Sequence, residues 1–322
     1  MKFDLKLYRG YANDNQLYVY GHLFKSWAPD KYRLDRKGLK HAFAILHMFR
    51  IRPLKNFEVT FQFQNVTATT KTLDDGYFEF NIPYTEDLES GWHTYQVSCE
   101  IKEIGIVEKG EFLKPYPSEY GIISDIDDTF LISHSDNFFK KLYVMLSKNI
   151  NKRKAFDDVV EHYKALSQAG QASDEASNSF FYVSSSEWNL YAFIEAFAQL
   201  HELPKAVIKL KKIKTGISDF LLTGRGQHDH KFDEIKRIIS FYPEMTYVLL
   251  GDDSQKDPFI YARVCKIFPN TVKAIYIRQT GKKHKTDVET TLETIKSLGV
   301  HICYFKDSSK AIKHSEDINI IS

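Results

Sequence analysis

The 322-residue sequence contains only three cysteines, Cys99, Cys265 and Cys303, which lie far apart and form no Cys-x-x-Cys pair. Neither a disulfide framework nor a zinc site is therefore expected, and a reducing compartment fits best. The first residues lack the apolar segment of a signal peptide. No apolar run approaches the ~20 residues that span a bilayer. We expect a cytoplasmic protein, and a peripheral contact with a membrane stays open.

An excess of charge of one sign is also missing, because the formal net charge is only +2. Dedicated nucleic-acid-binding proteins usually carry a large excess of Lys and Arg, so no nucleic-acid partner is expected. Hydrophobic residues make up 43% of the chain and charged residues 27%, which is typical of a soluble globular protein. The length fits two domains.

The first part of the chain has the alternating pattern of β-strands. From Phe57 to Gln64, apolar and polar side chains alternate strictly, which predicts a strand with one buried face. The same period recurs at residues 78–82 and 95–101, and Asp74-Asp75-Gly76 is typical of a turn. Several short strands separated by turns predict a β-sandwich domain over residues 1–115.

The pattern changes after two prolines in the segment 114–118. Continuous apolar segments then alternate with segments of helical period. The expected strands cover residues 120–124, 180–183, 247–250 and 272–277, and the expected helices cover residues 188–201, 232–241 and 258–268. This alternation predicts a second domain over residues 116–322, built on a mostly parallel sheet with helices on both faces. Ligands bind beyond the carboxyl ends of the strands in such sheets.

Three acids, Asp125, Asp127 and Asp128, follow the first of these strands. Three carboxylates within four residues repel one another unless a cation or hydrogen-bond donors compensate them. Magnesium prefers oxygen ligands and suits such a segment. An isolated Asp-x-Asp segment is more often a polar loop or the cap of a helix, but here the acids directly follow an apolar strand.

The other strand ends carry matching chemistry. Ser184 to Ser186 precede an expected helix and suit a phosphate cradle, or alternatively a helix cap. Asp252 and Asp253 directly follow the third strand. Lys231 starts another expected helix and is the best candidate for a cation that holds phosphate, although a solvated lysine fits its position equally well. Together, these strand ends predict a site for a metal and a phosphate.

Five motifs in this order resemble the haloacid dehalogenase (HAD) superfamily and, more closely, the catalytic domain of App1-type phosphatidate phosphatases. They are SDIDDT (124–129), FYVSSSEWNLY (181–191), HK (230–231), GDDSQKDPFIY (251–261) and AIYIR (274–278). The resemblance covers residues 120–305. It implies a HAD-like Rossmannoid α/β fold with a small helical cap inserted at about residues 133–178. Bacterial relatives of this type often carry an N-terminal β-domain.

The resemblance also implies roles. Asp125 would be the nucleophile that forms an aspartyl-phosphate, and Asp127 the general acid and base. Ser184 would hold the transferring phosphoryl group, and Lys231 would hold both this group and the nucleophile. Asp252 would ligate Mg²⁺ together with Asp125 and the backbone carbonyl of Asp127. The remaining candidates are Asp253 and Asp257 as supporting metal ligands, and Ser185 and Asp128 as substrate contacts.

Two positions depart from the pattern of the relatives. Where they usually have SSPWN this chain has Glu187 before Trp188, and where they have GDSGQ it has Asp253 and Ser254. The extra acid at 253 would add negative charge beside the metal, which would either tighten metal binding or repel an anionic substrate.

We therefore expect a Mg²⁺-dependent phosphomonoesterase acting on a phosphorylated substrate, with a lipid phosphate such as phosphatidate at a membrane surface as the leading candidate. One alternative is a soluble phosphomonoester or phosphoprotein. Another is a non-catalytic module that binds a phosphorylated ligand, although the presence of Asp127 favours an enzyme. Basic residues in the cap segment 138–154, and from Lys205 to Lys214, would either meet an anionic surface or simply face solvent.

Overall fold

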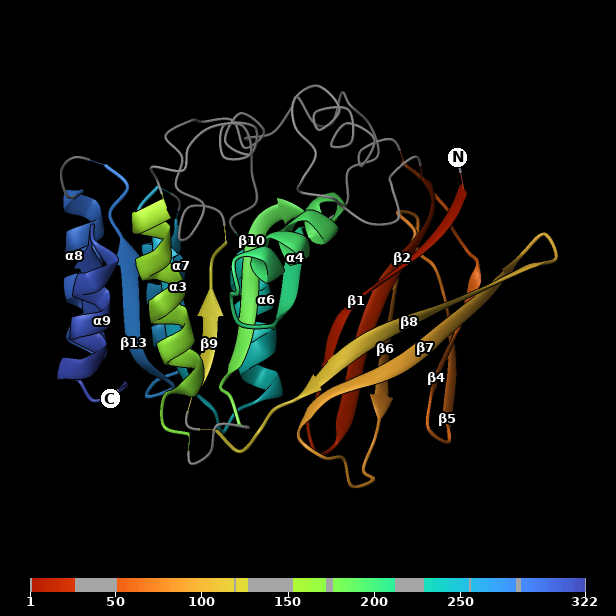
Figure 1. Cartoon of the computed structure of the whole chain (residues 1–322), viewed down its shortest axis with the longest axis horizontal. Helices are drawn as coiled ribbons and strands as arrows, with labels where there is room; N and C mark the ends of the chain where they lie inside the picture. The colour runs from red at the N-terminus through yellow and green to blue at the C-terminus, as the bar shows by residue number, and fades with distance from the viewer. Residues whose placement is uncertain are drawn as a thin grey trace. The chain divides into compact units, whose positions relative to one another are not determined.

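A computed structural model of the chain describes residues 2–26, 51–118, 120–126, 153–171, 176–211, 229–254, 256–281 and 285–321 (Figure 1). The described residues fall into two compact units. The first unit contains Met1–Pro117 and the short segment Glu187–Phe193, and the second contains the remaining described residues. No helix in the described ranges combines the length and apolar character needed to cross a membrane.

The first unit is built from strands. They are β1 (Lys2–Ala12), β2 (Gln16–Ser26), β3 (Ile51–Pro53), β4 (Glu58–Phe63), β5 (Val66–Lys71), β6 (Tyr77–Pro83), β7 (Gly91–Ile101) and β8 (Ile104–Lys114). Val59, Phe61 and Phe63 are buried as the alternation predicts, because they point to one face of β4 and join the core of this unit.

These strands are joined in one continuous hydrogen-bonded sheet. Its order is β3-β2-β1-β8-β7-β4-β5, and β6 pairs with β2 beside this path. The two halves are joined by a short parallel pairing, in which Gly10 lies opposite Phe112 and Tyr11 opposite Leu113. Because this contact joins β1 to β8, the antiparallel groups on either side become parts of a single sheet. The sequence pattern did not predict this contact.

The second unit has a mixed α/β architecture with a parallel sheet, as predicted. Its strands are β9 (Tyr120–Ser124), β10 (Ser179–Glu187), β11 (Ala206–Lys211), β12 (Thr246–Asp252), β13 (Val272–Arg278) and β14 (His301–Phe305), in the order β11-β10-β9-β12-β13-β14. Every neighbouring pair from β10 to β14 is parallel.

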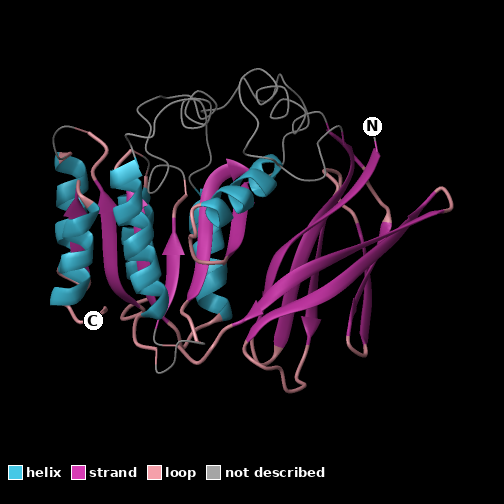
Figure 2. Cartoon of the chain, in the orientation of Figure 1, coloured by secondary structure: helices cyan, strands magenta, loops and turns pink. Residues whose placement is uncertain are grey.

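Helices accompany these strands (Figure 2). They are α3 (Arg153–Gln168), α4 (Tyr191–Leu200), α6 (Asp229–Phe241), α7 (Asp257–Ile267), α8 (Thr286–Lys296) and α9 (Ser308–Asp317). The 3-10 helix η2 (Trp188–Leu190) falls in the first unit. Helix α7 contacts both α6 and α8, and α3 contacts α9. The strand β9 and the helices α6 and α7 lie where the sequence pattern predicts them, within a few residues at each end.

The strand order reverses between β9 and β12. From β9 the chain adds β10 and then β11 on one side, and β12 to β14 extend the sheet on the other side. Leu250 of β12 lies opposite Ser124, the last residue of β9, and β12 continues beyond this point to Asp252. A reversal of this kind is where open α/β sheets bind ligands, and it places the expected site after Ser124 and Leu250.

Part of the segment predicted as a cap packs on the sheet. Helix α3 contributes His162, whose Nε2 lies 2.9 Å from Ser315 Oγ of α9. The ring of Tyr163 contacts that of Phe180 in β10, with 5.8 Å between centroids. The earlier part of the predicted cap, including the expected helix at 138–146, lies outside the described residues.

Candidate active site

Two buried carboxylates lie side by side where the strand order reverses. Asp125 follows β9 and Asp252 ends β12, and their exposed fractions are 1% and 0%. The backbone N–H of Asp125 donates to the carbonyl of Leu250 over 2.9 Å, which extends the β9–β12 pairing by one residue. The parallel register therefore brings together two acids that are distant in the sequence.

A third carboxylate, Asp257, comes from the first turn of α7. Its Oδ2 accepts a hydrogen bond from the backbone N–H of Asp252 at 3.2 Å. The close approach depends on Gly251, because a β-carbon at that position would lie 2.5 Å from Asp257 Oδ2. A glycine here leaves room for a carboxylate directly against the backbone of β12.

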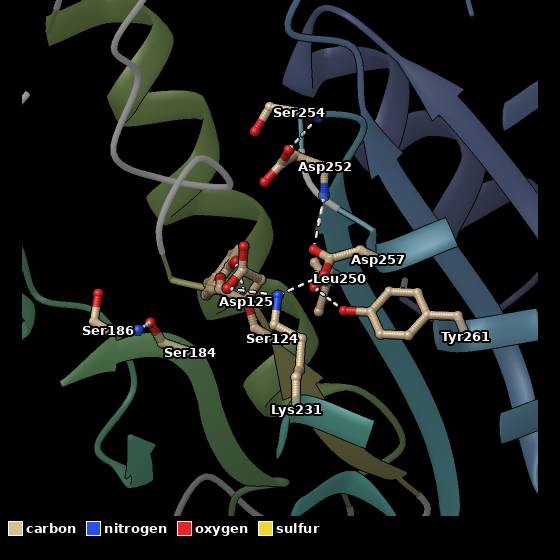
Figure 3. Close-up of polar contacts among 11 residues, drawn as sticks. Ser124, Asp125, Ser184, Ser186, Lys231, Leu250, Asp252, Ser254, Asp257 and Tyr261 are labelled. Carbon is tan, nitrogen blue, oxygen red and sulfur yellow. Dashed lines mark hydrogen bonds and ion pairs between the residues drawn. The ribbon is translucent and has the colours of Figure 1, made fainter. Parts of the chain in front are cut away.

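Lys231 supplies a buried cation to these acids. It lies on α6 and is only 2% exposed. Its Nζ lies 3.0 Å from Asp125 Oδ1 and 2.5 Å from Asp257 Oδ1. Figure 3 shows the amine between the two carboxylates. The ammonium offsets part of the cost of burying these charges, provided that all the partners stay in place.

The three carboxylates form a group that fits a metal ion. One oxygen each from Asp125, Asp252 and Asp257 lies within 4.8 Å of the others, and all three residues are buried. With one ammonium against three carboxylates, these four described residues carry an excess of negative charge. A donor set made of oxygen atoms suits a hard divalent cation such as Mg²⁺.

The serines of β10 differ in detail from the prediction. The strand runs on to Glu187, so the serines belong to the strand and do not precede a helix start directly. Ser184 is fully buried, and its Oγ accepts the backbone N–H of Ser186 at 2.9 Å. That N–H is therefore already used within the strand. Ser185 is exposed.

The structure does not bring every predicted site residue into this group. Asp253 is buried but lies apart, because its carboxylate accepts hydrogen bonds from Thr280 and Tyr304. Asp127 and Asp128 lie outside the described residues.

Two tyrosines that the sequence did not single out support Asp125. The Tyr261 hydroxyl donates to the carbonyl of Leu250 over 2.7 Å, and that carbonyl also accepts the N–H of Asp125. On the other side, Ser124 Oγ donates to the carbonyl of Asp125 over 2.8 Å and lies 2.6 Å from the Tyr163 hydroxyl. Burial raises the pKa of Tyr261, and the negative charges of Asp257 and Asp125 raise it further, so its hydroxyl stays a donor.

Lys209, which the sequence placed in a basic run facing solvent or an anionic surface, has a structural role instead. It lies in β11, its side chain is 2% exposed, and its Nζ is 3.3 Å from Glu234 Oε2 of α6. The run is partly a buried strand of the sheet, and a charge count could not distinguish this strand from a solvated segment.

Comparisons with known proteins agree with the motifs. Residues 120–279 match the family model described as phosphatidate phosphatase APP1, catalytic domain. The chain is also 29% identical over 171 residues to phosphatidate phosphatase APP1 of Saccharomyces cerevisiae. That match covers 51% of this chain and 27% of the yeast protein, so about half of this chain corresponds to about a quarter of the yeast protein.

Two solved structures show a weak likeness to the chain. A carbohydrate acetylesterase from Xanthomonas citri matches with a TM-score of 0.35 and 8% identity, covering 99% of this chain and 75% of that one. A β-glucuronidase from Parabacteroides merdae matches with a TM-score of 0.30 and 10% identity, covering 94% of this chain and 40% of that one. With TM-scores this low, neither structure indicates the fold or the activity of this chain.

Proposed function

We propose, on the premise that residues 120–279 form an App1-type phosphatidate phosphatase catalytic domain, that the protein is a phosphatase. The proposal assigns it the HAD-type mechanism of phosphoric monoester hydrolysis. The observation that carries it is the buried group of Asp125, Lys231, Asp252 and Asp257 at the reversal of the strand order.

Asp125 is the proposed nucleophile. A carboxylate oxygen attacks the phosphorus, the bond from phosphorus to the alcohol oxygen breaks, and an aspartyl-phosphate forms that water then hydrolyses. Lys231, 3.0 Å from Asp125 Oδ1, reduces the repulsion between this carboxylate and an anionic phosphate. Asp127, by resemblance, protonates the leaving alcohol and then activates the water. Ser184 is a candidate hydroxyl for holding the phosphoryl group.

Asp125, Asp252 and Asp257 are the residues that would hold Mg²⁺. When bound, the ion supplies positive charge that neutralises the phosphoryl oxygens. Lys231 meanwhile keeps Asp257 and Asp125 oriented through its two ion pairs.

The proposed substrate is phosphatidate or a related lipid phosphate. Its support is the name of the matching family and of the yeast relative. The reaction on such a substrate would release inorganic phosphate and leave diacylglycerol, and the lipid would be met at a membrane surface.

The test compares the native protein with Asp125→Asn, using p-nitrophenyl phosphate and phosphatidate in mixed micelles, each with Mg²⁺ or with EDTA. We expect turnover to fall by at least about 10³-fold in the variant, because losing a nucleophile removes the covalent route. The matched control is Asp307→Asn, an exposed acid beyond β14 that caps α9, where Asn caps equally well.

Each outcome of this test has a defined meaning. Preference for phosphatidate supports the lipid substrate, whereas preference for the soluble ester replaces it with a soluble phosphomonoester. Turnover that is unchanged in Asp125→Asn overturns the assigned nucleophile. Absence of turnover on both substrates, with retained binding of phosphate compounds, would make the domain a binding module.

A further inference from the structure

Asp253 ties together the carboxyl ends of three neighbouring strands. It follows β12 and is 1% exposed. Its Oδ1 accepts the backbone N–H of Thr280 at 2.8 Å and the Thr280 hydroxyl at 2.5 Å. Its Oδ2 accepts the hydroxyl of Tyr304 at 2.6 Å. Thr280 follows β13 and Tyr304 belongs to β14, so one carboxylate links the ends of β12, β13 and β14.

The backbone of Asp253 also makes hydrogen bonds at both its N–H and its carbonyl. Its N–H donates to the carbonyl of Arg278 over 3.0 Å, and its carbonyl accepts a hydrogen bond from Lys285 Nζ. The same Nζ lies 3.9 Å from Oδ1. A buried carboxylate is costly unless donors and a nearby cation satisfy it, and these contacts provide both.

The contacts of Asp253 also restrain its neighbour Asp252. The turn after β12 is tied on either side of Asp253, since the N–H of Ser254 donates to Asp252 Oδ1 over 2.5 Å and the N–H of Asp252 donates to Asp257 Oδ2. Asp252 and Asp257 both belong to the candidate metal group. A shift of Asp253 would therefore move a carboxylate of that group directly.

We propose that Asp253 is a positioning residue, which fixes the orientation of the Asp252 carboxylate through Thr280 and Tyr304 without contacting the metal itself. The proposal rests on the proposed function insofar as that function assigns Mg²⁺ to Asp125, Asp252 and Asp257. It gives the extra acid of the Gly251-Asp252-Asp253-Ser254 motif a role different from the added charge beside the metal that the sequence suggested.

The test measures Mg²⁺ binding by isothermal titration calorimetry, which requires no turnover, together with kcat and KM on p-nitrophenyl phosphate. The variants are Asp253→Ala, Asp253→Asn, Thr280→Val and Tyr304→Phe. Losing residues that orient metal ligands typically weakens metal affinity by about 10–100-fold, so we expect a change of this size in Asp253→Ala. We expect the loss to appear in kcat more than in KM.

The conservative variants separate positioning from ligation. Asn keeps an acceptor for Thr280, and the Tyr304 hydroxyl can accept from its amide, so Asp253→Asn should recover most of the affinity. Thr280→Val and Tyr304→Phe each remove one donor and should weaken Mg²⁺ binding by a smaller factor. The matched control is Asp307→Ala, which removes an exposed helix cap elsewhere at this edge of the sheet.

Three results would overturn the proposal. In the first, Asp253→Asn binds Mg²⁺ as poorly as Asp253→Ala while Thr280→Val and Tyr304→Phe bind normally, which is the behaviour of a direct ligand. In the second, all four variants bind Mg²⁺ like the native protein. In the third, the native protein binds no Mg²⁺. A native protein that binds Mg²⁺ but hydrolyses neither p-nitrophenyl phosphate nor phosphatidate contradicts the proposed function alone. The Mg²⁺ affinities of the variants still decide the role of Asp253. If Asp253→Ala fails to fold, Thr280→Val and Tyr304→Phe still decide it.

Discussion

Gly251 and Asp257 lie so close that a β-carbon on the glycine would be 2.5 Å from Asp257 Oδ2. The opposite oxygen, Oδ1, receives Lys231 at 2.5 Å. The Asp257 carboxylate is therefore fixed between the backbone of β12 and the amine of α6, and the missing side chain at 251 sets its position.

Replacing Gly251 with Ala should push Asp257 out of this position. We expect about 1–3 kcal/mol of destabilisation from overpacking, and about a 10²-fold loss of phosphatase activity from the misplaced carboxylate. Urea unfolding and steady-state kinetics measure the two effects. Gly105→Ala is the control, because a β-carbon there meets no atom within 4 Å. If Gly251→Ala matches this control in activity, Asp257 does not need its observed position.

Lys231→Met should lower the free energy of unfolding, because it leaves buried carboxylates without their cation. Removing one partner of a buried ion pair typically destabilises a protein by about 3–5 kcal/mol, and Lys231 has two such partners. Combining Lys231→Met with Asp257→Asn should restore part of the lost stability, because the unpaired charge of Asp257 is removed as well. A double-mutant cycle of unfolding free energies, run in EDTA, gives the coupling. Additive effects would show that the ion pair contributes nothing.

Tyr261→Phe should weaken the support of Asp125 without removing any charge. The Leu250 carbonyl still accepts the hydrogen bond from the N–H of Asp125, but it no longer accepts the one from the Tyr261 hydroxyl, which is 2.7 Å long. We therefore expect a loss of stability of about 1 kcal/mol. Burial and the nearby carboxylates raise the pKa of Tyr261, so its hydroxyl stays protonated and the difference from the native protein should be equal at pH 7 and pH 9. A difference in unfolding free energy that shrinks at pH 9 would contradict a permanently protonated tyrosine.

The buried His162 predicts how stability depends on pH. Burial, with a smaller effect of Arg278, lowers its pKa to about 3, from an ordinary value near 6.5. Between these two values the unfolded chain binds a proton that the folded chain does not, so stability falls as the pH falls through this window. The loss attributable to this residue is about 1.4 kcal/mol per pH unit.

His162→Gln isolates this contribution, because burial also lowers the pKa of His22 to about 3 and the native protein carries both effects. Urea unfolding at pH 7, 6 and 5 should show a shallower pH dependence in the variant, by about one proton. An identical dependence in the two proteins would mean that His162 is protonated in the folded state.

Residues next to strand ends were predictable, whereas their partners were not. Asp125 and Asp252 follow apolar segments, and parallel strands end at a common edge, so the sequence alone indicated that they meet. Thr280 and Tyr304 lie 27 and 51 residues beyond Asp253, and no local pattern marks them as its donors. Lys209 shows the same limit, because neither its burial in β11 nor its ion pair with Glu234 can be read from the basic run in the sequence.

The pairing of β9 with β12 also has a consequence during synthesis of the protein. Asp125 and Asp252 lie 127 residues apart in the chain, and at about 5–20 residues per second the ribosome delivers the second roughly 6–25 s after the first. Until then β9 has no β12 beside it, and Leu250 is not yet present to receive the N–H of Asp125. A nascent chain that ends before Thr246 therefore contains the proposed nucleophile but no site around it.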